Sequence, residues 1–218
     1  MTRSTVQSGL MFSGSLHRDD GQALLIVGIH REELPFGERV VAQLAETGGL
    51  SRIRVLTIPE GISGQHPRAD QRFQYELQHR AIYRQIRELA VGHRLLIDLH
   101  RGEDDHSCAD VICADSRLLD CVGRRWEGQR LSKAVVGHDE RVRAVQLTAD
   151  DASPGGSGVA GRTVIPADVW NNSDFLFVGL EVYVPTAGVG QAEDWRFAAS
   201  LVESIVQCAG GPGVTEKG

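Results

Sequence analysis

Two histidines and two glutamates lie at or near the ends of apolar runs, where they could bind and use a metal ion. The first run covers residues 23–29; it ends at His30, and Glu33 follows three residues later. This spacing puts both side chains on one face of a single turn, so an imidazole nitrogen and a carboxylate oxygen can reach one metal ion. For this pair alone, a solvated loop with two polar residues is the alternative.

Two later apolar runs supply the other polar groups of such a site. Residues 95–100 (LLIDLH) end at His100, and Glu181 interrupts residues 175–184 (FLFVGLEVYV). Two histidines and a carboxylate are a common ligand set for catalytic zinc, which lowers the pKa of a bound water to about 7. Glu181 is costly to bury unless it is paired or works in a site, so it is the candidate general base. A Glu181 that faces water on an edge strand is the alternative.

Asp98 lies two residues before His100 in the sequence. Positions i and i+2 of a strand share a face, so Asp98 could hydrogen-bond His100 and orient its ring. The alternative is an Asp98 that bonds a neighbouring backbone group.

Apolar runs of strand length alternate with segments of helical periodicity along the chain. Strands are predicted over residues 22–29, 53–58, 95–100, 111–114, 144–147 and 175–184, and helices after Pro35, in the second half of 72–90, after Asp115 and over 195–206. The alternation predicts an α/β fold with a mostly parallel or mixed twisted sheet and helices on both faces. Ligand sites in such sheets form beyond the carboxyl ends of the strands, so the four polar residues are expected to meet there.

The composition of the chain is typical of a soluble globular protein. Its 218 residues are 41% hydrophobic and 24% charged, with a formal net charge of −6. The length predicts one domain, residues 1–209, with a disordered tail over 210–218. An acidic chain disfavours nucleic acid as a partner, and no apolar run reaches the roughly 18 residues of a membrane span. The polar start shows no secretory signal, so a cytoplasmic location is expected.

The sequence also contains four cysteines and one long polar segment. Cys108, Cys113, Cys121 and Cys208 contain no C-x-x-C pair, and we expect a cytoplasmic enzyme to keep them reduced. Residues 149–174 are rich in Asp, Ser, Gly, Pro and Asn, and are predicted to form a long loop. A mobile lid is the role expected for this loop.

Three motifs in order along the chain resemble a known enzyme family. Gly-x-His-x-x-Glu-x-Pro-x-Gly covers residues 28–37, Ile-Asp-Leu-His covers 97–100 and Gly-Leu-Glu-Val covers 179–182. Together they resemble the succinylglutamate desuccinylase/aspartoacylase family of zinc carboxypeptidase-like enzymes, and they span most of the chain. The resemblance implies a zinc-carboxypeptidase-like three-layer sandwich. It also implies one Zn²⁺ held by His30, Glu33 and His100, with Glu181 as general base and acid.

The same family carries an Arg and, seven residues later, an Asn-Arg pair. Arg72 matches the first position, and His79 and Arg80 match the pair. By resemblance, Arg72 polarises the scissile carbonyl and stabilises its oxyanion, while Arg80 and His79 hold a substrate carboxylate. From charge alone, a solvated helix face is the alternative for both arginines.

The sequence also departs from the family pattern. Arg31 stands where the family usually has Gly, which narrows or charges the mouth of the site, and His79 replaces the usual Asn. The chain is shorter than typical members, and their C-terminal β-rich domain is expected to be absent. Substrate identity therefore does not carry over from the family.

The predicted activity is a zinc-dependent amidohydrolase that removes an acyl group from an N-acyl amino acid or a related small amide. The alternative is a metallocarboxypeptidase or amidase that acts on a peptide, with Arg80 binding the terminal carboxylate. A non-catalytic metal-binding module is a third reading. A homo-oligomer that completes the site is left open by the sequence.

Overall fold

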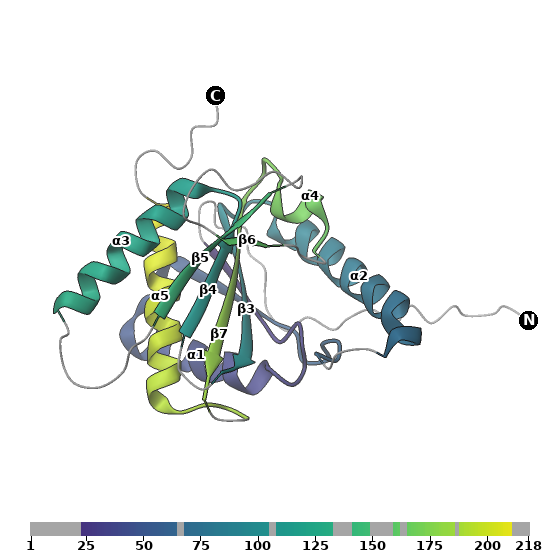
Figure 1. Ribbon diagram of the computed structural model, residues 1–218, viewed down its shortest axis with the longest axis horizontal. Helices are drawn as coiled ribbons and strands as arrows, with labels where there is room; N and C mark the ends of the chain where they lie inside the picture. Colours follow the sequence, from purple (N-terminus) through teal and green to yellow (C-terminus); the bar gives the residue numbers. More distant parts are fainter. Residues whose placement is uncertain are drawn as a thin grey trace, which may run out of the picture.

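The computed structural model describes residues 23–64, 68–104, 108–132, 141–148, 159–161, 165–185 and 188–210 (Figure 1). Its strands are β1 (Ala23–Val27), β2 (Ile53–Thr57), β3 (Leu95–Glu103), β4 (Cys108–Cys113), β5 (Arg141–Leu147), β6 (Val159–Gly161) and β7 (Leu176–Val184). The α-helices are α1 (Leu34–Thr47), α2 (Arg72–Ala90), α3 (Ser116–Ser132), α4 (Ala167–Trp170) and α5 (Ala192–Ala209). Two short 3₁₀ helices, η1 (Gly49–Arg52) and η2 (Ala69–Gln71), precede β2 and α2.

The described strands form one mixed sheet in the order β2-β1-β3-β7-β4-β5-β6. Strands β2, β1, β3 and β7 run parallel, β4 is antiparallel to β7, and β5 and β6 run parallel to β4. Because β1, β3 and β7 share one direction, their carboxyl ends lie at the same edge of the sheet. The predicted α/β class with a mixed sheet is therefore confirmed.

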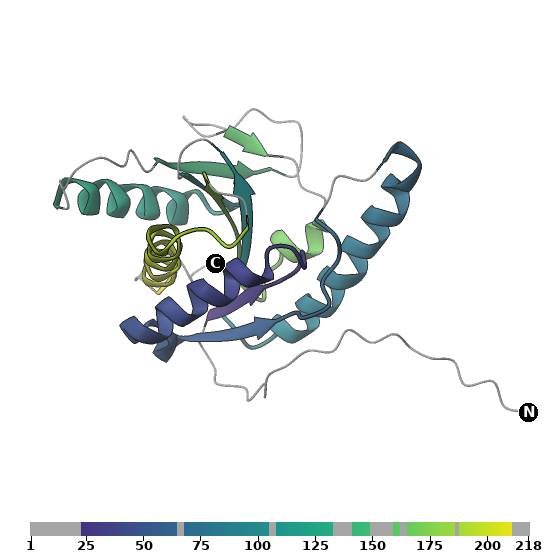
Figure 2. The same cartoon turned by 90° about the horizontal axis from the view of Figure 1, so that it is seen from below.

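Helices cover both faces of the sheet and bury an apolar core on each (Figure 2). On one face, α1, α3 and α5 pack over residues such as Leu25, Ile97 and Val182. On the other face, α2 and α4 pack over a smaller core that includes Leu24, Ile26 and Phe177. Alternate residues of β1 belong to opposite cores, as the period of two in a strand requires. The fully apolar β1 is thus a strand buried on both faces.

Two glycines of the 28–37 motif make a tight connection between β1 and α1. Gly28 has a left-handed φ of 87°, and a Cβ there would lie 2.7 Å from the Ile58 carbonyl oxygen. A Cβ on Gly37 would lie 2.7 Å from the Val27 Cβ, so the helix can touch the strand only because this side chain is missing. Pro35 in the first turn of α1 agrees with the predicted start of the helix.

Several predicted element boundaries are corrected by the structure. Strand β3 continues past His100 to Glu103, so this histidine is inside the strand and not at its end. Part of the predicted 149–174 loop is regular, because it contains β6 and the short α4. The lid role predicted for residues 149–174 stays a prediction, and residues 149–158 and 162–164 of this segment lie outside the described residues. So do residues 211–218 of the predicted tail.

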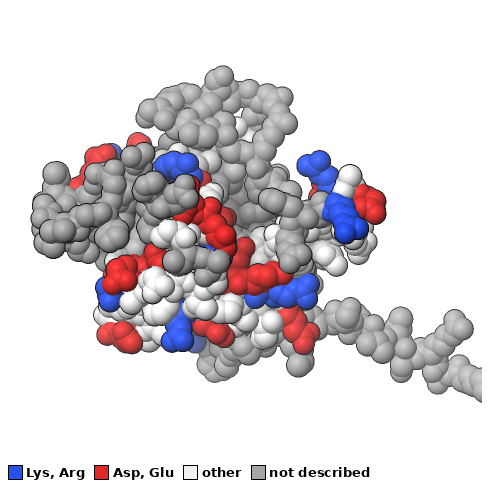
Figure 3. All heavy atoms as spheres, turned by 60° about the horizontal axis from the view of Figure 1, so that its bottom comes forward, with Lys and Arg blue, Asp and Glu red and all other residues white. Residues whose placement is uncertain are grey.

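The surface of the described part shows no single dominant charge on the face in Figure 3. Acidic and basic side chains are interspersed there, with the acidic ones gathered toward the middle of the view. Among the described helices, none combines the length and the apolar composition needed to cross a membrane.

A disulfide bond links Cys121 of α3 to Cys208 of α5, with a Cα–Cα distance of 5.9 Å. The expectation that all four cysteines stay reduced is therefore wrong. The two helices lie side by side on the same face of the sheet, which brings residues 87 positions apart within bonding geometry. Cys108 and Cys113 are buried in β4 outside this bond.

Reduction of the disulfide should lower the free energy of unfolding by about 2 to 4 kcal/mol, because the bond restricts the unfolded chain over a long loop. Urea unfolding with and without dithiothreitol measures this loss. The double variant Cys121→Ala/Cys208→Ala is the control and should unfold identically in both conditions. If the urea midpoint of the wild-type protein is the same with and without dithiothreitol, the prediction is contradicted.

Candidate metal centre

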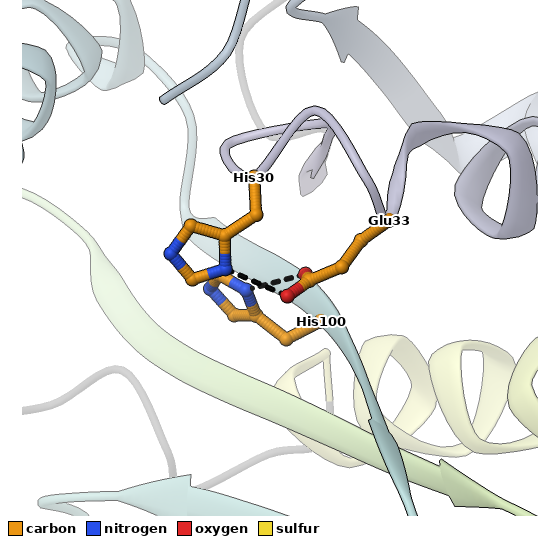
Figure 4. Close-up of side chains that lie close together, drawn as sticks. All are labelled: His30, Glu33 and His100. Carbon is orange, nitrogen blue, oxygen red and sulfur yellow. Dashed lines mark hydrogen bonds and ion pairs between the residues drawn. The ribbon is translucent and has the colours of Figure 1, made fainter. Parts of the chain in front are cut away.

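His30, Glu33 and His100 lie together and point toward one another, as Figure 4 shows. One nitrogen or oxygen atom from each side chain lies within 4.8 Å of the others. The Glu33 carboxylate bridges the two rings, with Oε1 2.7 Å from His30 Nδ1 and Oε2 2.9 Å from His100 Nδ1. The structure thus brings together the three residues predicted as metal ligands.

Backbone hydrogen bonds hold the turn that carries His30 and Glu33. The Ile62 N–H donates to the Ile29 carbonyl at 2.8 Å, and the Arg31 N–H donates to the Ile62 carbonyl at 3.0 Å. These bonds extend β1 by an isolated bridge at His30. The Glu33 N–H then donates to the His30 carbonyl at 3.0 Å, which closes the turn before α1.

Asp98 supports His100 from the side away from Glu33. Its Oδ2 lies 3.0 Å from His100 Nε2, which confirms the contact predicted from their i, i+2 spacing. Asp98 is 0% exposed, and the Tyr83 hydroxyl donates a second hydrogen bond to Oδ2 at 2.6 Å. An acceptor at Nε2 orients the ring so that Nδ1 faces the cluster.

Opposite charges dominate the titration of this cluster. Burial alone would raise the pKa of Glu33, but hydrogen bonds with His100 and His30 hold it at about 2. Burial alone would lower the pKa of His100, but the Asp98 and Glu33 carboxylates raise it well above its usual value. The carboxylate of Glu33 is thus ionised and ready to bind a cation at neutral pH.

His79 of α2 contacts the ring nitrogen of His30 that does not face Glu33. Its Nδ1 faces the Tyr75 carbonyl oxygen at 2.9 Å, and its Nε2 lies 3.1 Å from His30 Nε2. A carbonyl only accepts, so Nδ1 of His79 carries the proton, and burial lowers the pKa of His79, which favours the neutral ring. Neutral His79 then accepts at Nε2, which places a proton on His30 Nε2 and directs His30 Nδ1 to the cluster.

Glu181 lies in β7 directly beside His100 of β3 in the parallel register. On its other side Glu181 pairs with Asp110 of β4. Burial raises the pKa of Glu181 to about 7. A carboxyl group with a pKa near neutrality can both accept and donate a proton in the physiological range. The predicted proximity of Glu181 to the cluster is therefore present, and its environment suits acid–base chemistry.

A cavity of about 210 Å³ opens beside the cluster. Its polar wall comes from the cluster, α2 and β7, and its apolar wall from β4, β5 and β7. The described lining residues are His30, Tyr75, His79, Tyr83, Asp98, His100, Ile112, Val145, Leu147, Ile165, Phe177, Gly179, Leu180 and Glu181. A small molecule in this cavity would contact the cluster and Glu181 together.

The predicted arginines are not brought to this cavity. The Arg72 side chain is 78% exposed, and its Nε lies 3.7 Å from Glu76. Arg80 lines a neighbouring cavity of about 490 Å³ between α2 and α4, which shares Ile165 with the cavity beside the cluster. The Arg31 side chain is 61% exposed and lies 3.6 Å from Glu32, so it faces water instead of lining the described part of the cavity.

Tyr75 and Tyr83 contribute to the site but were not predicted from the sequence. They flank His79 at four residues on either side, and this i, i+4, i+8 pattern puts all three rings on one face of α2. That pattern was the available signal. The apolar wall from β4 and β5 had no comparable signal, because its residues look like ordinary core positions.

The donor set fits a single divalent metal ion such as zinc. Two imidazole nitrogens and one carboxylate oxygen converge, and each histidine has its second nitrogen engaged by the protein, as metal-binding histidines generally do. Both engaged nitrogens are Nε2, which leaves both Nδ1 atoms for the ion.

Neither the comparison with family models nor that with curated proteins finds a match. Similar solved structures include murine aminoacylase 3, with a TM-score of 0.46, 13% identity, and coverage of 88% of this chain and 66% of that one. An N-acetylmuramoyl-L-alanine amidase of Nostoc punctiforme has a TM-score of 0.42, 12% identity, and coverage of 86% and 97%. A succinylglutamate desuccinylase from a Silicibacter species has a TM-score of 0.40 and 15% identity; the matched part is 88% of this chain but 58% of the desuccinylase.

Replacement of Tyr83 by Phe should lower the free energy of unfolding by about 1.5 to 3 kcal/mol, because it removes a hydrogen bond to a buried charged group. Urea unfolding measures the change. Tyr183→Phe is the matched control, since its hydroxyl lies 3.3 Å from the Asp110 carboxylate in a less buried setting. Equal losses in the two variants would show that Asp98 does not depend on Tyr83.

Proposed function

We propose that this protein is a zinc-dependent hydrolase that removes an acyl group from an N-acyl amino acid or a related small amide. The observation that carries the proposal is the convergence of His30, Glu33 and His100 beside the partly buried Glu181, with His30, His100 and Glu181 lining one cavity. Three ligands leave a coordination position for water or substrate, which is the arrangement of catalytic zinc sites.

His30 and His100 would bind the ion through their Nδ1 atoms and Glu33 through its carboxylate. A zinc ion bound there would polarise an amide carbonyl and acidify water. Asp98 and His79 keep the two imidazole rings oriented, so that the ligand atoms need little rearrangement when the ion binds.

Glu181 is the group that handles protons in this proposal. Its carboxylate oxygen accepts a proton from the attacking water as the new C–O bond forms at the carbonyl carbon. The same oxygen then delivers that proton to the amide nitrogen as the C–N bond breaks, which yields a carboxylic acid and a free amine. Burial suits both steps, because it brings the pKa of Glu181 to about 7.

The cavity favours a small substrate. Its volume of about 210 Å³ is below the range of about 300 to 1,000 Å³ found for pockets of drug-sized ligands. The proposal assigns no step to Arg72 or Arg80, since neither contributes to the described lining.

Glu181→Gln should retain zinc and lose at least about 100-fold in kcat, because an amide cannot accept the proton of the attacking water. Zinc content by elemental analysis and hydrolysis of a panel of N-acyl amino acids measure the two effects. Glu38→Gln, an exposed position of α1, is the matched control and should behave like wild type in both assays.

Two outcomes would overturn the proposal. One is a purified wild-type protein that binds no zinc when the ion is supplied. The other is a Glu181→Gln variant that hydrolyses the panel as fast as wild type.

His79→Leu should weaken zinc binding by about 10- to 100-fold, because His30 Nε2–H loses its acceptor. His79→Gln keeps a side-chain oxygen that can accept this proton, so it should weaken binding less. Competition with a chromophoric chelator measures the affinity of each folded variant. His93→Leu replaces another buried histidine at the opposite end of β3 and should leave zinc affinity unchanged. Equal affinities in all three variants would exclude this role for His79.

A further inference from the structure

The cavity beside the cluster is polar on one side and apolar on the other, and this division follows the sheet register. Asp98, Gly179, Ile112 and Val145 are direct neighbours across β3, β7, β4 and β5. All four line the cavity, so this row forms part of its floor. Along the row, the lining changes from a carboxylate to apolar side chains.

The apolar half is built from more than one element. Leu147 of β5 and Phe177 of β7 extend the floor, and Ile165, just before α4, adds a further apolar side chain. Ile112 and Ile165 are only partly buried, although they lie against the sheet and α4. Their remaining exposed surface is therefore available to a bound group in the cavity.

Gly179 keeps space open at the centre of this half. A Cβ added there would lie 3.4 Å from Ile112 Cβ and 3.8 Å from Phe177 Cε1, which are ordinary contact distances. Alanine would thus fit without a clash but would occupy room that a ligand can use. Glycine in the middle of a strand commonly marks a close approach by a ligand or another backbone.

The described lining offers no cation to an acidic substituent. It contains the carboxyl groups of Asp98 and Glu181 but neither Lys nor Arg. Arg80 and Arg84 line the neighbouring cavity between α2 and α4, which shares Ile165 with this one. A carboxylate placed against Ile112 and Val145 would lose its hydration without gaining an ion pair, which carries a large energetic cost.

We propose that the amide substrate carries an uncharged apolar group, which binds against Ile112, Val145, Leu147, Ile165 and Phe177. The inference rests on the proposed function and narrows its substrate class. The apolar group belongs either to the acyl chain or to the amine side, since both flank the scissile bond. Acidic substituents such as those of aspartate or a succinyl group are excluded from this half of the cavity.

The binding test uses zinc-loaded Glu181→Gln protein, in which turnover should be at least about 100-fold slower than in wild type. Isothermal titration with N-acetylleucine, N-hexanoylglycine and N-acetylaspartate should show one of the two apolar compounds binding at least about 10-fold more tightly than N-acetylaspartate. Preference for N-acetylleucine places the apolar group on the amine side, and preference for N-hexanoylglycine places it on the acyl side. Tighter binding of N-acetylaspartate would overturn the inference.

The Gly179→Ala variant provides a second test of the apolar subsite. It should weaken binding of the preferred apolar ligand about 10-fold relative to N-acetylglycine, because the added methyl group takes space from the larger group. Gly123→Ala in α3, where an added Cβ meets nothing within 4 Å, is the matched control and should leave all affinities unchanged. Equal losses for the large and the small ligand would contradict an apolar subsite at Gly179.

Turnover by the wild type separates this inference from the proposed function. Hydrolysis that favours acidic substrates would uphold the proposed function and overturn the apolar subsite. Apolar ligands that bind preferentially to Glu181→Gln, together with no hydrolysis of any panel member by zinc-loaded wild type, would uphold the subsite and overturn the hydrolase.

Discussion

The buried charge of Asp98 is the constraint on which the site depends. A carboxylate at the centre of a sheet, with no exposed surface, is tolerated only if its partners replace the lost water. The Tyr83 hydroxyl and His100 Nε2 replace it at Oδ2, whereas Oδ1 has no hydrogen-bond partner in the described part of the chain. Tyr83 belongs to α2, so the interactions that stabilise the charge also fix this helix against the sheet. His100 is fixed at the same time, and its other nitrogen is presented to Glu33.

The same network extends from His100 through Glu33 to His30 and on to His79. It therefore ties β1, the start of α1, β3 and α2 into one unit, although the residues are far apart in the sequence. Strand order completes the site. Strand β7, late in the chain, inserts between β3 and β4 and so places Glu181 beside His100. Strands β4 and β5 follow β7 in the strand order, so they lie on the far side of the cavity and supply its apolar wall.

The sequence was sufficient to predict the site residues that break an apolar pattern. His30 ends one strand-like run, with Glu33 three residues later, while His100 ends a second run and Glu181 interrupts a third. The parallel pairing of β3 with β7 places His100 directly beside Glu181. Asp98 followed from the two-residue period of a strand. The cysteine pairing was beyond this reasoning, since four cysteines allow three complete pairings and the sequence does not show which helices are adjacent.

The arginines show that spacing along the sequence is not enough to predict which side chains reach the cavity. Arg80 follows His79 directly, so it lies about 100° around the helix and faces the other cavity when His79 faces His30. Arg72 shares the face of His79 but lies about 10 Å nearer the start of α2, beyond the cavity. A matched motif shows which residues are present. The rotation of α2 about its axis, and how far each residue lies along that axis from the cavity, decide which of them reach the site. That rotation is set by the partners of Tyr83 and His79, which are non-local in the sequence.

The two histidines of the cluster are supported by different chemistry, and the difference matters for Glu181. His100 rests on an anion, Asp98, which strengthens its donor nitrogen, whereas His30 rests on the neutral ring of His79. A second carboxylate at the position of His79 would add negative charge to a site that already holds Glu33 and Asp98. Like charge raises the pKa of a carboxyl group, and Glu33 and Asp98 already act on Glu181 in this direction. In the proposed mechanism, a neutral His79 therefore orients the ring of His30 without adding a negative charge that would raise the pKa of Glu181 further.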